Sequence, residues 1–221
     1  MLTTRRRTAA AGLLAALALS VTACGGDSTG DSSGDKIKGT DSGQSGSATP
    51  STSASATAGT NAPAFDLPSD ITVTVDRQPT GDATKDAVLR DVAYAAQARV
   101  EAFGKGDGET ANLSRFLAAN ARIYWADRVA EFKKEGLTVT GDYRYYGFEV
   151  TDVVNGKAAA HYCEDQSKAY NKEIKTGKVQ RTQPSDKDFV LYTVQAARDS
   201  AGDWQVVQQN WTKGDASCVQ G

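Results

Sequence analysis

Residues 143–170, YRYYGFEVTDVVNGKAAAHYCEDQSKAY, are the stretch that decides the fold. Two runs, Tyr143 to Val154 and Lys157 to Tyr170, flank the dipeptide Asn155-Gly156. Both runs are rich in Val, Tyr, Phe or Ala, and valine and aromatic residues favour strands. Asn-Gly between two such runs is a strong signal for a two-residue hairpin turn. The stretch therefore predicts two long antiparallel strands that lie side by side.

Two more strand-like runs follow this hairpin. They are Asp188 to Arg198 and Asp203 to Lys213, and a tight turn is predicted at Ser200 to Asp203. The alternation along these strands predicts one face that is buried against helices. The residues expected on that face are Tyr146, Phe148, Val150, Ala158, Ala160, Tyr162, Val190, Tyr192 and Val194.

The residues before the hairpin have a helical period. Asp82 is a plausible N-cap, and a helix of about 20 residues follows it, with its apolar stripe from Val88 to Phe103 and its end at the run Gly104 to Gly108. The residues expected on its buried stripe are Val88, Val92, Ala95, Ala96, Val100 and Phe103.

Two shorter helices are predicted at Leu113 to Ala118 and at about Asn120 to Glu135, before a cap at Gly136. In the second of these helices, four positions are expected to share one face: Ile123, Ala126, Val129 or Ala130, and Lys133. Ile71 to Val75 alternates, and is either a short first strand or an extended lead-in.

Helices followed by an antiparallel meander predict an α+β fold, with N-terminal helices on a curved four-stranded antiparallel sheet. The element order, with segments such as Tyr162 to Ser167 (YCEDQS) and Asp203 to Val206 (DWQV), resembles the nuclear-transport-factor-2-like (cystatin-like) cone. More closely, the chain resembles small secreted lipoproteins of Gram-positive bacteria that carry this domain on a Ser/Thr-rich tether. The resemblance covers about residues 70 to 215. It implies a pocket between helices and sheet, which in some relatives performs proton transfer and in others binds a ligand or a partner.

The N-terminus has the three parts of a secretory signal, predicted at residues 1–23. Arg5 to Arg7 are basic, and Ala9 to Leu19 is an apolar run too short to span a bilayer. Val21-Thr22-Ala23-Cys24 then resembles the lipobox of bacterial lipoproteins, which implies a diacylglyceryl group on the Cys24 thiol. The alternative is an incidental thiol after an ordinary cleavage site. Both the general and the twin-arginine export routes remain open.

Residues 24–67 have the composition of a tether. Gly, Ser, Thr, Ala and Asp dominate, so the segment buries too little apolar surface to fold and is expected to be disordered. As a flexible coil of about 40 residues it has a root-mean-square span of roughly 35 Å. Residues 68–221 are the size of one domain. The predicted location is the cell membrane, with the domain lipid-anchored on its extracytoplasmic face.

The formal charge narrows the classes of partner. The chain carries −2, and removing residues 1–23 takes away three arginines and no acid, which leaves −5. This charge argues against nucleic acid. The sequence also lacks a polybasic patch for anionic lipid. The expected partners are the membrane, through the lipid anchor, and an envelope protein, a wall polymer or a small ligand.

Cys163 and Cys218 are the two thiols that remain after Cys24. An exported chain meets oxidising conditions, so this even pair predicts a disulfide that pins the tail across the sheet. The alternative is two unpaired thiols.

His161 is the single histidine and the obvious candidate base, since its ordinary pKa lies near neutrality. By strand parity it points to the side of Cys163 and Asp165, so it lies outside the pocket if Cys163 is on the convex face. Asp165 and Asp91 are further candidate bases, although no motif assigns them a role. No metal site, phosphate loop or catalytic triad is indicated, and no cofactor is expected.

Two functional hypotheses remain. The first is a non-enzymatic module, anchored in the membrane, that binds a ligand or a protein. The alternative is a small-molecule isomerase or dehydratase that uses the cone pocket. The basic connection Asn171 to Lys187 is either a pair of solvated strand extensions or a contact surface for anionic wall polymer or a partner protein. The aromatic residues are expected mainly in the core, and some of them line a cavity or mark an interface.

Overall fold

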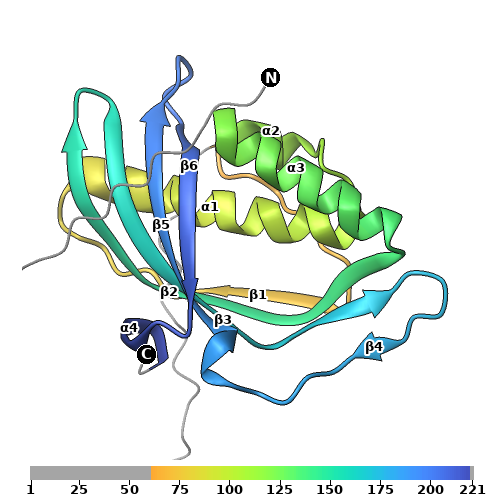
Figure 1. Ribbon diagram of the computed structural model, residues 1–221. Coiled ribbons are helices and arrows are strands. Elements are labelled where there is room, and N and C mark those ends of the chain that lie inside the picture. Colours follow the sequence, from red (N-terminus) through yellow and green to blue (C-terminus); the bar gives the residue numbers. More distant parts are fainter. Residues whose placement is uncertain (1–60, 220–221) are drawn as a thin grey trace, which may run out of the picture. The chain divides into compact units, whose positions relative to one another are not determined.

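The computed structural model describes residues 61–219, which form an α+β domain (Figure 1). Its helices are α1 (Ala83–Lys105), α2 (Ala111–Phe116), α3 (Ala119–Lys134) and the short C-terminal α4 (Ala216–Val219). Its strands are β1 (Ile71–Val75), β2 (Leu137–Val154), β3 (Lys157–Glu173), β4 (Val179–Gln180), β5 (Phe189–Arg198) and β6 (Trp204–Lys213). A 3₁₀ turn, η1 (Asp186–Asp188), precedes β5. The predicted signal peptide, Cys24 and most of the predicted tether lie outside the described residues.

The sheet differs from the predicted four-stranded antiparallel sheet. Six strands form one mixed sheet in the order β1-β2-β3-β5-β6, with β4 paired to the end of β3. The pairs β2–β3, β3–β5 and β5–β6 are antiparallel as predicted, whereas β1 pairs with β2 in parallel. Helices α1, α2 and α3 all lie between β1 and β2 in the chain. This helical crossover lets the two strands run in the same direction.

The helices α1, α2 and α3 cover one face of the sheet, and α4 lies on the other side (Figure 1). Helix α1 begins where predicted, because the Asp82 side chain accepts hydrogen bonds from the backbone N–H groups of Thr84 and Lys85 at 2.8 and 3.0 Å. Its predicted stripe is confirmed: all six residues either belong to the main core or pack against it.

The predicted shared face of α3 was largely wrong, because Val129 is the one residue of that set that is buried, while Ala126 is half-buried and Ala130 and Lys133 are exposed. Ile123 is 61% exposed, and the buried stripe consists instead of Ala121, Trp125 and Val129. These three residues recur every four positions, so they share one face. The large ring of Trp125 packs against Phe103 of α1, and this packing turns Ile123 toward solvent.

One residue in β2 changes the predicted parity. Tyr146 was expected under the helices, but it packs with Cys163 and Cys218 on the opposite face, while Tyr145 is fully buried in the main core. The pairing shifts by one residue between Tyr146 and Glu149, so β2 contains a bulge there. Gly147 occupies the bulge with φ +62°, a conformation that glycine adopts without steric cost. The other residues of the predicted face do pack in the main core or against it.

Residues 61–67, which the sequence analysis placed in the tether, contact the domain. Phe65 and Leu67 pack against the main core. The backbone N–H of Asp66 donates to Glu101 at 2.8 Å, and the Asn112 amide donates to the backbone oxygen of Ala64 at 2.9 Å. Ordered contacts therefore extend N-terminal to the expected start at residue 68.

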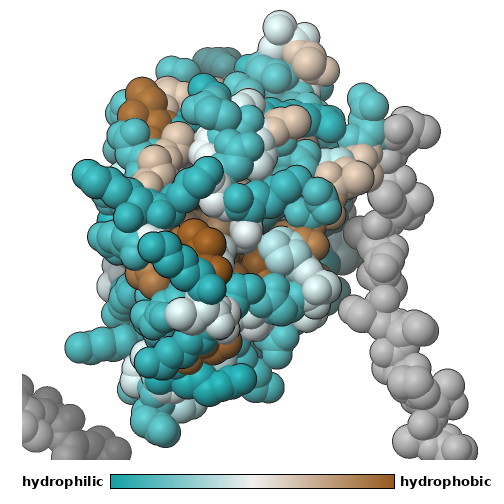
Figure 2. All heavy atoms as spheres, turned by 90° about the vertical axis from the view of Figure 1, so that its right-hand side faces the viewer, coloured by the Kyte–Doolittle hydropathy of each residue, from teal (hydrophilic) through white to brown (hydrophobic). Residues whose placement is uncertain are grey.

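The surface on the side of the α3–β2 and β3–β4 connections is predominantly hydrophilic (Figure 2). Hydrophobic atoms appear there as small patches, several of them near the middle of the face. Among residues 61–219, no helix is long and apolar enough to cross a membrane.

Candidate functional site

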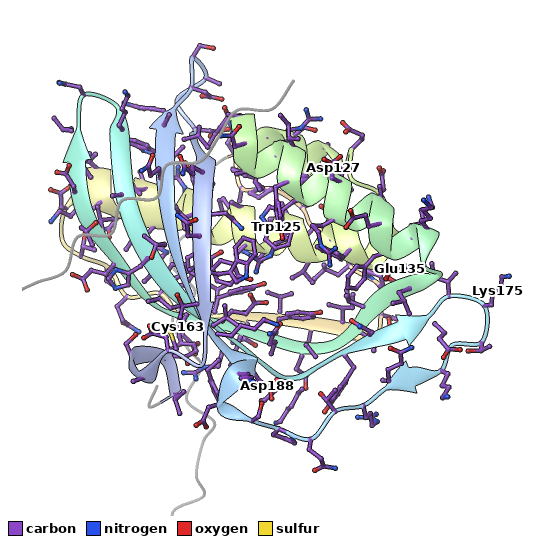
Figure 3. All side chains as sticks on the ribbon, viewed as in Figure 1. Trp125, Asp127, Glu135, Cys163, Lys175 and Asp188 are labelled. Atoms are coloured by element: carbon purple, nitrogen blue, oxygen red, sulfur yellow. A yellow bond between two sulfur atoms is a disulfide. The ribbon has the colours of Figure 1, made fainter. Side chains whose placement is uncertain are left out.

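A pocket of about 400 Å³ lies between the helices and the sheet. Side chains from α1, α3, β2, β3, β5 and β6 line it, so it occupies the position that the sequence analysis expected. Figure 3 shows Trp125 directed from α3 toward the sheet, whereas Asp127 of the same helix points away from it. The volume is within the range of small-molecule sites.

A buried ion pair lies in the wall of this pocket. Arg99 of α1 donates from Nη2 to Oε2 of Glu164 on β3 at 2.6 Å, and the two side chains are 5% and 4% exposed. The Tyr145 hydroxyl lies between the partners, since it accepts from Arg99 Nη2 and donates to Glu164 Oε1, both at 3.3 Å. Isolated buried charges are costly, and this pairing is what allows both groups to stay inside the domain.

Four tyrosines in or beside this pair stay protonated at neutral pH. Burial raises the pKa of Tyr162 to about 12, with smaller contributions from Arg99, which lowers it, and from Glu164. Burial is also the main reason why the pKa values of Tyr143, Tyr145 and Tyr192 lie above their ordinary value. Their hydroxyl groups therefore serve as neutral hydrogen-bond donors and acceptors.

The Arg99 guanidinium also contacts aromatic faces. Its central carbon lies 4.8 Å from the ring centroid of Trp125 and 4.4 Å from that of Tyr192. The competing effects of burial, which lowers the pKa of Arg99, and of the Glu164 carboxylate, which raises it, leave this pKa well above its ordinary value. A permanently charged guanidinium between aromatic rings is a stable arrangement.

An aromatic series connects the interior of the pocket to the surface. Trp211 of β6 lies 5.9 Å from Trp125 and 5.2 Å from Tyr124, centroid to centroid. Trp211 and Tyr124 are 39% and 38% exposed, so they form the rim. A ligand that enters past these rings meets apolar faces before it reaches the ion pair.

Two side chains that line the pocket each have a buried donor atom without a hydrogen-bond partner among residues 61–219. These atoms are Nη1 of Arg99 and Nε1 of Trp125. Buried polar atoms in native proteins nearly always have a partner, so each exception needs an explanation.

The predicted candidate bases lie away from this pocket. His161 faces the opposite side of β3, where its Nε2 lies 3.5 Å from Glu149 Oε2. Asp165 lines a separate surface hollow beside β1, and its Oδ1 accepts from the backbone N–H of Ser167 at 2.9 Å. Neither side chain contacts the Arg99–Glu164 pair.

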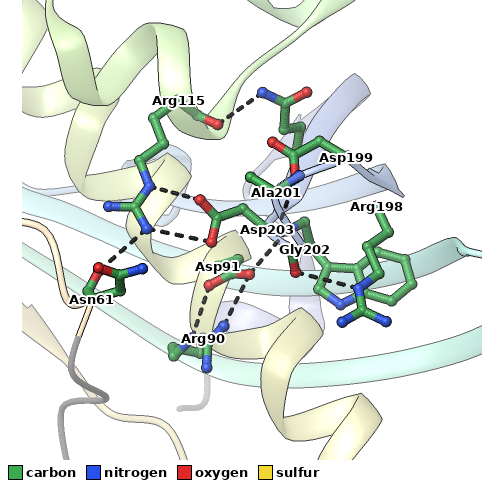
Figure 4. A network of polar contacts seen from close by, with 11 residues as sticks. Asn61, Arg90, Asp91, Arg115, Arg198, Asp199, Ala201, Gly202 and Asp203 are labelled. Atoms are coloured by element: carbon green, nitrogen blue, oxygen red, sulfur yellow. Dashed lines mark hydrogen bonds and ion pairs between the residues drawn. The ribbon is translucent and has the colours of Figure 1, made fainter.

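Asp91 belongs to a polar network at the other end of α1 (Figure 4). It is 1% exposed, its Oδ1 accepts from Arg90 at 2.8 Å, and its Oδ2 accepts from the backbone N–H of Trp204 at 2.9 Å. Arg115 binds Asp203 beside it through two hydrogen bonds. This network joins α1 and α2 to the start of β6, a structural role for Asp91.

Cys163 and Cys218 form the predicted disulfide, with their Cα atoms 5.5 Å apart. The bridge lies on the side of the sheet opposite the long helices and holds α4 there (Figure 3). The Tyr146 hydroxyl donates to the backbone oxygen of Cys218 and adds a second link.

Arg99 and Glu164 were not among the predicted site residues, although the sequence carries a signal for both. Arg99 follows Val92, Ala95 and Ala96 by seven, four and three residues, so it falls on the buried stripe of α1. Glu164 shares the inward parity of Tyr162. A cation and a carboxylate at buried positions of two elements are a reason to expect pairing. Within residues 61–219, no cluster of three or more candidate ligands is placed to hold a metal ion.

Comparisons with known proteins identify similar folds only. No family model matches the chain, and no curated protein does either. The intermembrane space region of the chloroplast protein ARC6 is 18% identical, with a TM-score of 0.41 over 61% of this chain and 99% of the other. A ketosteroid isomerase-like protein from Erwinia carotovora atroseptica is also 18% identical, with a TM-score of 0.37 over 57% and 96%. A protein from Catenulispora acidiphila is 10% identical, with a TM-score of 0.39 over 60% and 95%. With TM-scores below 0.5, none of these likenesses carries an inference about activity.

Proposed function

We propose that the chain is an envelope lipoprotein whose domain, of the nuclear-transport-factor-2-like type, binds a small molecule in the pocket without reacting with it. The observation that carries the binding function is the pocket of about 400 Å³ with aromatic walls and an internal ion pair. Apolar walls with a few convergent polar groups are typical of small-molecule sites.

The ion pair favours binding over catalysis. Glu164 is the one carboxylate that lines the pocket among the described residues, and both of its oxygens accept hydrogen bonds from within the domain. A general base needs an oxygen that faces the proton it removes. An isomerase or dehydratase would have to break the bonds from Arg99 and Tyr145 first, so this alternative takes second place.

A fluorescence titration with N-phenyl-1-naphthylamine, a neutral apolar probe, tests the binding function on the full chain. Ala169 lines the pocket, so Ala169→Phe should fill it and reduce the affinity for the probe at least tenfold. Thr193→Phe adds the same ring at an exposed position of β5 and should leave the affinity unchanged. Probe binding that is absent, or equal in all three proteins, would overturn the proposed function.

The proposed anchor rests on residues 21–24 and has its own test. The wild-type protein should fractionate with membranes and incorporate a palmitate analogue, because a lipid group with two acyl chains gives stable anchoring. Cys24→Ala should be released into the soluble fraction without label. A labelled, membrane-bound Cys24→Ala protein would contradict the anchor but leave the pocket untouched.

A further inference from the structure

The segment from the end of β3 to the start of β5 is opposite in charge to the rest of the domain. Residues 61–219 contain 20 basic and 23 acidic residues, a net charge of −3. Residues 171–187, called the basic arm from here on, contain five basic and two acidic residues, a net charge of +3, so the other described residues carry −6. The five cations are Lys172, Lys175, Lys178, Arg181 and Lys187, and the two acids are Glu173 and Asp186. A polyanion is therefore repelled by most of the domain and attracted at the arm.

The backbone of the basic arm is an ordered hairpin, in which β4 pairs with the end of β3. The N–H of Glu173 donates to the backbone oxygen of Lys178, and the N–H of Gly177 donates to that of Glu173, both at 2.9 Å. The N–H of Ile174 donates to the backbone oxygen of Gly136 at 2.8 Å, which joins the tip of the arm to the α3–β2 junction. Cations on such a fixed backbone lose less conformational entropy on binding than those of a disordered tail.

Three cations of the arm are available to a partner. Lys175, Lys178 and Arg181 are exposed, and none of them has an ion-pair partner within residues 61–219, whereas Nζ of Lys172 lies 2.5 Å from Asp70. Lys175 lies at the turn and points away from the domain (Figure 3). The Arg181 guanidinium lies over the ring of Tyr170, 5.0 Å from its centroid. Stacking uses the flat face of a guanidinium, so its N–H groups remain free to bind an anion.

The acids near these cations do not neutralise them. The Glu173 carboxylate accepts from the Thr176 hydroxyl at 2.8 Å, and it is the one acid near the turn of the arm. Asp186 lies at the far end of the arm, and Asp188 beside it accepts from the backbone N–H of Ser185 at 2.7 Å. The tip of the arm is therefore its most positive part.

The kind and the spacing of the cations specify the partner. Lysine acts on phosphate as a compact point charge, whereas planar carboxylates are matched best by the fork of arginine. The three available cations are spaced three residues apart, over at most roughly 20 Å of chain, so they suit a chain of repeated anions better than one small anion. Ile174 is the one large hydrophobic residue of the arm that is strongly exposed, at 50%, and this gives little apolar surface to insert into a bilayer.

We propose that the basic arm binds a phosphate-bearing polymer of the cell envelope. The phosphate groups lie against Lys175, Lys178 and Arg181, and no covalent bond is made or broken. The source of the polymer rests on the proposed envelope location. The binding itself does not depend on the pocket, because none of these three side chains lines it.

Calorimetric titration of the full chain with long-chain inorganic polyphosphate tests this surface. Lys175→Gln/Lys178→Gln should lower the affinity by about tenfold, because two cation–phosphate contacts are lost. Lys85→Gln/Lys157→Gln is the matched control. It makes the same change in net charge at two exposed lysines, at the starts of α1 and β3, and should leave the affinity nearly unchanged.

The salt dependence measures how many contacts are lost. On flexible polyanions, each phosphate contact adds about 0.7 to the slope of log affinity against log salt concentration. The slope should therefore be shallower by about 1.4 in Lys175→Gln/Lys178→Gln than in the wild-type protein. It should stay at the wild-type value in Lys85→Gln/Lys157→Gln.

Several outcomes would overturn the proposed partner. No binding of polyphosphate, or equal losses in the two double variants, would show that the arm is not a specific site. Tighter binding to polygalacturonate, or to vesicles of phosphatidylglycerol, would assign the arm to a carboxylate polymer or to a membrane instead. All the substitutions are at exposed side chains, so circular dichroism should show folded variants. Their affinity for N-phenyl-1-naphthylamine should equal that of the wild-type protein, which separates a failure of the arm from a failure of the pocket.

Discussion

Arg99 and Glu164 show how a buried ion pair constrains a domain at the level of single residues. Both side chains are at most 5% exposed, so each owes its place inside to the other. Removal of one partner leaves a buried charge, whereas removal of both leaves an apolar site. Each charge therefore depends strongly on its partner, although the pair as a whole adds little net stability over an apolar replacement.

A double-mutant cycle should show this asymmetry. Arg99→Met and Glu164→Leu should each destabilise the domain by about 3–5 kcal/mol, because an uncompensated charge stays buried. The double variant should lose less than either single variant. Urea unfolding measures all four proteins, and single losses that simply add would refute the coupling.

Alkaline pH should destabilise the domain through its tyrosines. Tyr162 has an unfolded pKa of 10.0 and a folded pKa of about 12, so the unfolded chain releases its proton first as the pH rises. The stability contribution is complete below pH 10 and is lost between pH 10 and about 12. Tyr162→Phe should have a shallower loss over this interval, measured as the free energy of unfolding against pH. If the free energy of unfolding falls with pH at the same slope in both proteins, Tyr162 does not contribute to the alkaline destabilisation.

The individual site residues were only partly predictable. Arg99 and Glu164 occupy positions where the sequence period already demands burial, so their pairing had a visible signal. The pairing register that brings Tyr145 beside them, and the two donors that lack partners, depend on three-dimensional packing. No spacing rule in the sequence reveals them.

At the scale of elements, β2 departs most from its prediction. The strand begins at Leu137, six residues before the predicted start. The prediction began too late because Gly141-Asp142 interrupts the strand-like composition. Gly141 is required there by β3: a Cβ atom would lie 2.1 Å from the backbone oxygen of Lys168, and φ is +99°. A residue that weakens the strand signal is thus the one that permits the pairing.

Gly141→Ala should therefore disrupt the pairing of β2 with β3 and destabilise the domain. Gly177→Ala is the matched control, since its φ is also positive, at +69°, but nothing lies within 4 Å of the added Cβ. The control should lose about 1–2 kcal/mol from the backbone conformation alone, and Gly141→Ala several kcal/mol more from the clash. Thermal unfolding of both variants measures the two losses of stability. Equal losses would show that the clash is relieved by movement of β3.

At the scale of the whole molecule, the disulfide joins the C-terminal tail to the middle of the chain. It bridges Cys163 and Cys218, 55 residues apart, on the side away from the pocket. The α+β class followed from the change of period after Gly136, and the bridge followed from the number of cysteines together with the predicted export. The parallel pairing of β1 and the contacts of residues 61–67 could not be predicted from the sequence, because they depend on tertiary packing.

Cys163→Ser/Cys218→Ser should lower the free energy of unfolding by about 4 kcal/mol, since the open chain gains loop entropy. Affinity for N-phenyl-1-naphthylamine should not change, because the bridge and the pocket lie on opposite sides of the sheet. Chemical reduction of the wild-type protein should reproduce the loss in urea unfolding. A loss of probe binding would instead show that the bridge shapes the pocket.

The contacts of residues 61–67 determine where a mechanical load would enter the domain. A pull from the N-terminal side reaches first the Arg115 hydrogen bond to Asn61, then the Asn112 bond to Ala64 and the Lys105 bond to Asp66. These three bonds lie on α1 and α2, ahead of β1, so they take the strain in turn before the sheet does. A load carried by the predicted tether would therefore meet these three bonds before it reaches the sheet.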